Sequence, residues 1–84
     1  GNKNGMWDAI EKFSKASNVF PNNGEPFYWM AISYTKLGDT EFDLILESYE
    51  KSLSLELSEK IKIEAEKKYE KAKKRKQKLD SFWK

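Results

Sequence analysis

The stretch "FPNNGEPFYWMAISYTKLGD", residues 20–39, decides the fold that the sequence predicts. It holds five aromatic side chains and both prolines of the chain. The turn signal Pro21-Asn22-Asn23-Gly24 opens it, because proline cannot continue a helix and Asn and Gly favour turns. Gly38 closes it, since glycine readily adopts the left-handed conformation that often ends a helix. Between them we expect one short helix that begins near Glu25, with Pro26 in its first turn.

Apolar residues on both sides of this stretch recur at spacings of three and four, the period of one helix face. Before it, this spacing predicts a helix over residues 6–20. After it, a third helix is expected, capped by Asp39 or Thr40 and ending near Glu56. Ser58 resembles a fresh N-cap, so a fourth helix should begin near Glu59 and run without a breaker to the terminus. We expect its second half to project past the rest of the protein.

An internal repeat accompanies these helices. "AIEKFSKASNVFP", from Ala9, aligns with "ILESYEKSLSLEL", from Ile45, at an offset of 36 residues. The pattern Phe27-x2-Met30-Ala31-x2-Tyr34 lies between the two copies. This arrangement resembles the tetratricopeptide repeat, whose pattern is W-x2-L-G-x2-Y, then A-x3-F, then P. The resemblance covers roughly residues 7–57.

The resemblance implies an all-α, tetratricopeptide-like array of about four helices in a single domain, residues 1–84. Residues 6–20 would be a lone repeat helix, 25–57 a complete helical hairpin, and 58–84 a long basic capping helix. Two positions depart from the family pattern. Ile45 replaces a small residue, which should push the paired helices apart or shift their register, and Leu57 replaces the closing proline.

The resemblance also implies a function, which is to bind a partner peptide or helix in a concave groove. The side of the second helix that faces such a groove would present Tyr28, Trp29, Ile32 and Lys36. Tyr and Trp often anchor interfaces. The alternative is that these aromatic side chains pack on an adjacent repeat or on the fourth helix. Apolar residues at Tyr28 and Ile32 favour an apolar peptide or helix over a carboxylate tail as the partner.

If the helix that precedes it in a repeat is missing, the apolar face of the first helix would lack half of the surface that it normally packs against. The sequence therefore predicts either that the protein self-associates or that the chain is a segment taken from a longer array. In both cases Trp7 and Phe13 are expected near the exposed edge.

Charge is distributed unevenly along the chain. Residues 1–59 carry five lysines against ten acidic residues, a net charge of −5, whereas residues 60–84 carry eleven basic residues against four acidic ones, a net charge of +7. The run Lys73-Lys74-Arg75-Lys76 could bind a polyanion, either nucleic acid or an anionic membrane surface. A single Arg leaves few bidentate contacts to base edges, and residues 73–78 offer no apolar face to a membrane. A solvated helix explains the run more simply.

Residue types that carry chemistry are scarce. The chain has no Cys and no His, which removes thiolate nucleophiles, the commonest metal ligand and the commonest general base. No motif indicates a nucleophile, a phosphate-binding loop or metal-ligand spacing, so we expect no enzyme, no cofactor and no metal. No apolar run approaches the ~18 residues of a membrane-spanning helix.

Overall fold

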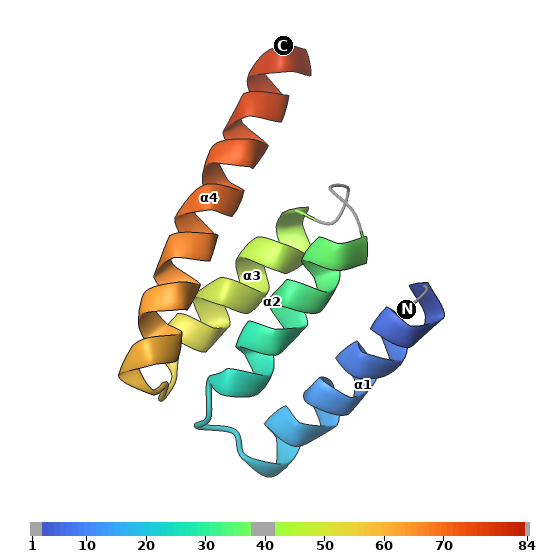
Figure 1. Cartoon of the computed structure of the whole chain (residues 1–84), viewed down its shortest axis with the longest axis vertical. Helices are drawn as coiled ribbons and strands as arrows, with labels where there is room; N and C mark the ends of the chain where they lie inside the picture. The colour runs from blue at the N-terminus through green and yellow to red at the C-terminus, as the bar shows by residue number, and fades with distance from the viewer. Residues whose placement is uncertain (1–2, 38–41, 84) are drawn as a thin grey trace.

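The computed structural model describes residues 3–37 and 42–83, which form four α-helices (Figure 1). They are α1 (Lys3–Val19), α2 (Glu25–Leu37), α3 (Phe42–Ser54) and α4 (Glu59–Trp83). No β-strand occurs within the described ranges. The predicted all-α array of four helices is therefore confirmed.

The helices lie side by side in chain order, and each packs on the next (Figure 1). α2 and α3 run antiparallel, as do α3 and α4, so α2 and α4 point the same way (Figure 1). Because α2 and α3 run in opposite directions, they are two helices rather than one continuous rod (Figure 1). The expected roles of Gly38 as the closing residue, and of Asp39 or Thr40 as the cap, lie outside the described residues.

Local signals place most helix ends where the sequence predicts them. α2 begins at Glu25, where the Asn23 Oδ1 accepts a hydrogen bond from the Glu25 backbone N–H at 3.0 Å. α4 begins at Glu59, and the Ser58 hydroxyl oxygen accepts from the Ile61 N–H at 3.4 Å. α1 starts three residues before the predicted residue 6 and ends one residue before residue 20. Side-chain caps thus satisfy part of the free N–H groups at two helix starts.

The expected end of the third helix near Glu56 is two residues too late, because two connecting segments pair with each other. The Glu56 N–H donates to the Asn22 carbonyl oxygen at 2.9 Å, and the Gly24 N–H donates to the Glu56 carbonyl oxygen at 2.7 Å. Together these bonds form an isolated parallel bridge between Asn23 and Glu56. Glu56 therefore cannot continue α3, which ends at Ser54.

The core is a single cluster shared by all four helices. Its buried apolar members are Ile10, Tyr28, Ala31, Tyr34, Ile45, Tyr49, Ala65 and Ala72. Ala31 and Ala65 are fully buried, which lets neighbouring helices approach closely. Ile45 is also buried, so the array accommodates this larger residue inside its core.

α4 stays in contact with α3 for most of its length. The Tyr69 hydroxyl donates to Glu50 Oε2 at 2.9 Å, and Lys76 Nζ lies 2.8 Å from Asp43 Oδ1, in the first turn of α3. Ile61, Ala65, Tyr69 and Ala72 of α4 belong to the core cluster or pack against it. The projecting part of α4 is shorter than expected, because the contact with α3 reaches as far as Lys76 (Figure 1).

Candidate protein-interaction groove

A groove of about 280 Å³ runs between α2 and α4, with α3 beneath it. α2 contributes Ile32, Thr35 and Lys36, α3 contributes Tyr49, and α4 contributes Lys68, Lys71, Ala72 and Arg75. The Thr35 hydroxyl already donates to the Ala31 carbonyl oxygen at 2.8 Å. The apolar surface of the groove comes from Ile32 and Ala72. Its cationic side chains are those of Lys36, Lys68, Lys71 and Arg75.

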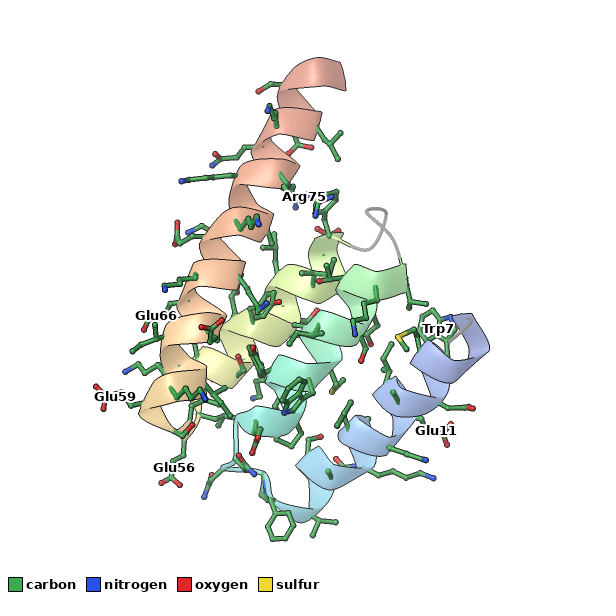
Figure 2. The ribbon with its side chains drawn as sticks, in the orientation of Figure 1. Trp7, Glu11, Glu56, Glu59, Glu66 and Arg75 are labelled. Carbon is green, nitrogen blue, oxygen red and sulfur yellow. The ribbon has the colours of Figure 1, made fainter. Side chains whose placement is uncertain are left out.

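Cationic side chains dominate the charge of the groove. Within residues 3–37 and 42–83, its lining includes four cationic side chains and no carboxylate. Arg75 lies over the ring of Phe42, with its guanidinium carbon 6.0 Å from the ring centroid, and in Figure 2 it extends from α4 toward the beginning of α3. Glu59 and Glu66 point to the opposite side of α4 (Figure 2). These two carboxylates therefore do not offset the cations on the side of α4 that faces α2.

The opposite end of the same α2–α4 surface is acidic. Glu25, at the start of α2, accepts a hydrogen bond from Trp29 Nε1 at 3.4 Å. Glu64, near the start of α4, adds to the effect of burial in raising the pKa of the Tyr28 phenol. Because α2 and α4 run in the same direction, the surface changes from negative at the starts of the two helices to positive farther along (Figure 1).

The four residues that the sequence assigns to partner binding differ in burial and do not all line the groove. Ile32 and Lys36 line the groove, and Trp29 is 39% exposed on the same side of α2. Tyr28 is only 5% exposed, and its ring packs at 6.3 Å from the ring of Tyr49 and at 5.1 Å from that of Trp29. Tyr28 therefore belongs to the core rather than to a free binding surface, and the ring of another helix that it meets, Tyr49, lies on α3 rather than on an adjacent repeat or on the fourth helix. The helical period could not show that Tyr28 lies close to α3.

Tyr49 forms the floor of the groove. Burial raises the pKa of its phenol to about 12, against a smaller lowering effect from the hydrogen bond with Thr35. The phenol is therefore neutral at physiological pH, and the floor adds no negative charge to oppose the cations above it.

The four residues of the basic run also divide between different surroundings. Lys73 Nζ lies 3.2 Å from Glu70 Oε1 and 4.8 Å from the centroid of the Tyr69 ring. Lys76 pairs with Asp43, Lys74 borders a shallow hollow beside Lys71, and Arg75 lines the α2–α4 groove. Helical geometry separates these four neighbours, because successive residues point about 100° apart. They do not form one continuous basic face.

Lys68, Lys71 and Ala72 are groove residues that the sequence analysis did not select. Lys68, Lys71 and Arg75 are spaced by three and four residues, the spacing that aligns side chains on one helix face. That signal was present in the sequence, but the denser run at residues 73–76 obscured it.

A second hollow, larger at about 510 Å³, lies between α2 and α3 and shares no residue with the groove. Phe27, Met30, Tyr34 and Leu44 give it apolar surface, whereas Glu47, Glu50 and Lys51 give it mixed charge. Mixed charge selects no partner chemistry, so this hollow is the weaker candidate for recognition despite its size.

Nothing in residues 3–37 and 42–83 indicates a metal or membrane-embedded site. This part of the chain holds no group of three or more Asp and Glu residues placed to bind a metal ion. None of its helices is long and apolar enough to cross a membrane.

Comparison of the chain with protein-family models, with curated proteins and with solved structures gave no match. The tetratricopeptide resemblance therefore stays a prediction from the sequence pattern.

Proposed function

We propose that the protein is an interaction module that binds a peptide or helix of a partner protein in the α2–α4 groove. The observation that carries this proposal is the groove itself, a hollow of about 280 Å³ between three helices. Apolar side chains line it together with one lysine from α2 and three cationic side chains from α4. An apolar floor with a polar rim is the usual anatomy of a protein-recognition site. The repeat pattern of the sequence supports the same conclusion, because helical arrays typically recognise partners along an extended face.

A polyanion-binding function is the alternative, and the net charge of residues 60–84 is the observation in its favour. Two of the four lysine and arginine side chains of the basic run, Lys73 and Lys76, pair with carboxylates of the protein itself. Binding to a phosphate backbone would compete with these pairs. It would also weaken steeply with salt, because it depends on phosphate contacts, whereas binding in the groove also includes apolar contacts with Ile32 and Ala72 that salt does not screen.

Selection from an unbiased library of displayed helical peptides tests the proposal. The chain should enrich specific peptides, and Ile32→Glu should abolish their binding, because it puts a carboxylate on the apolar part of the groove. Ile63→Glu is the matched control, since Ile63 is an exposed isoleucine on α4 outside the groove. Failure to enrich any peptide, or equal loss of binding in both variants, would contradict the proposal.

A further inference from the structure

We infer that the occupant of the α2–α4 groove is an acidic amphipathic helix whose carboxylates recur at spacings of three and four residues. This inference rests on the proposed function and specifies the chemistry of the partner.

The first argument is charge complementarity. Lys36, Lys68 and Lys71 line the groove, and among the described residues no ion pair joins any of them to a carboxylate. Arg75 is held at the end of the groove over the ring of Phe42. The three lysines around one small groove repel one another, and an acidic partner relieves that repulsion while a basic partner increases it. The cations therefore select for carboxylates and against basic segments.

The second argument is spacing. Lys68, Lys71 and Arg75 lie on one stripe of α4, and the first and last are seven positions apart, which is about 10 Å at 1.5 Å per residue. A partner helix lying alongside α4 presents carboxylates at the same intervals when its acidic residues are at i, i+3 and i+7. Lys36 reaches the groove from α2, across from this stripe. The arrangement thus matches a helix more closely than it matches a single terminal carboxylate.

The third argument is that the groove is not purely electrostatic. Ile32 and Ala72 provide an apolar strip among the cations. One apolar residue at i+4 of the partner lies on the same face as its acidic residues and fits this strip. The acidic end of the surface, at Glu25 and Glu64, repels the acidic stripe and so fixes its position toward Lys36 and Arg75. Nucleic acid lacks such an apolar stripe, which is why a peptide is favoured.

Fluorescence anisotropy with three synthetic peptides tests the inference on the whole chain. The first probe is a capped helical peptide with Glu at i, i+3 and i+7 and Leu at i+4. The second has Gln in place of each Glu, and the third is a scrambled sequence of the same composition. We expect the first peptide to bind about tenfold or more tightly than either of the others, because only it pairs with the full stripe of cations.

Charge reversal locates the contact. Lys36→Glu combined with Lys71→Glu should weaken binding of the acidic peptide about tenfold or more, since it replaces attraction by repulsion. Lys12→Glu combined with Lys78→Glu is the matched control, with the same change in net charge at two exposed lysines outside the groove. At physiological salt, distant exposed charges are largely screened, so the control should change the affinity by no more than about twofold. The acidic peptide should also shift the amide resonances of residues 32–36 and 68–75 of the unaltered chain, which checks the site without any substitution.

Four results would overturn the inference. Binding of the Gln peptide or the scrambled peptide as tight as that of the acidic one would leave the groove a peptide site without the proposed charge selectivity. Equal loss of affinity in both double variants, or displacement of the peptide by a short single-stranded oligonucleotide that binds as tightly, would indicate a general polyanion surface. Absence of binding by the acidic peptide also overturns it, while the unbiased library decides the proposed function separately.

Discussion

The backbone carbonyl oxygen of Ser52 occupies the space that a Cβ atom at Gly24 would need. The Leu57 side chain closes the same space from another direction, at 3.1 Å from that Cβ position. This close approach is the point where the segment before α2 meets the end of α3, next to the bridge between Asn23 and Glu56. Because backbone rather than a flexible side chain is in the way, no rotamer change can make room.

Gly24→Ala should therefore destabilise the fold by about 1–3 kcal/mol, the usual cost of overpacking. Chemical denaturation followed by circular dichroism measures this. Gly5→Ala is the control, because Gly5 is an exposed residue within α1, where alanine should stabilise by about 0.5–1 kcal/mol. Equal stability of the Gly24 variant and the unaltered protein would show that the two segments do not meet as described.

Tyr49 should be the last tyrosine to ionise. Burial raises its folded-state pKa to about 12, above the ordinary value of 10.0, so the folded state holds this proton more tightly than the unfolded state. The stabilisation linked to this proton is complete below pH 10 and is lost as the pH rises from about 10 to about 12. Ultraviolet absorbance of tyrosinate should show one late-titrating phenol that Tyr49→Phe removes. Titration of every tyrosine near its ordinary value in the folded protein would contradict the burial of Tyr49.

Ile45→Ala should cost about 2–5 kcal/mol, because it leaves a cavity in the core cluster that contains Ala31 and Tyr49. Leu44→Ala, at the neighbouring position, should cost about 0.5 kcal/mol or less, since Leu44 is exposed. Thermal denaturation of the two variants makes the comparison. Similar losses at both positions would mean that α3 is rotated relative to the arrangement described here.

Removal of residues 78–84 should change the stability by no more than about 0.5 kcal/mol, because the described side chains that it removes, those of residues 78–81, are exposed. Lys76 makes the last described contact of α4 with α3, and residues 77–81 are all exposed. Removal of residues 73–84 is the comparison, because it also deletes the Lys76–Asp43 pair and the contact of Arg75 with Phe42. A large loss on the shorter truncation would show that the distal part of α4 packs on the rest of the protein.

Self-association through the exposed side of α1 stays a prediction. Trp7 is 47% exposed although its ring meets that of Tyr34 at 6.1 Å, and Phe13 is half-buried. Sedimentation equilibrium should detect association that Trp7→Glu weakens about tenfold or more, as expected for an interface tryptophan. Ile63→Glu should leave it unchanged, because Ile63 is equally exposed, at 47%, and belongs to α4, which α2 and α3 separate from α1 (Figure 1). A strict monomer at high concentration would rule out this use of α1.

The sequence by itself determined four helices and most of their limits. Pro26, Ser58 and the apolar spacings are local signals, and local backbone chemistry decides where a helix starts and stops. The end of α3 was predicted two residues too late, because a non-local backbone bond to Asn22 withdrew Glu56 from the helix.

Only the tertiary structure decided which side chains meet. Tyr28 and Trp29 are neighbours in the sequence, yet packing against Tyr49 buries the first while the second stays exposed. Lys36 and Lys71 are far apart in the chain and line one groove, whereas Lys76 pairs with Asp43. A periodic pattern defines a helix face, but the rotation and spacing of packed helices depend on side chains from distant segments. The basic groove is a product of that packing.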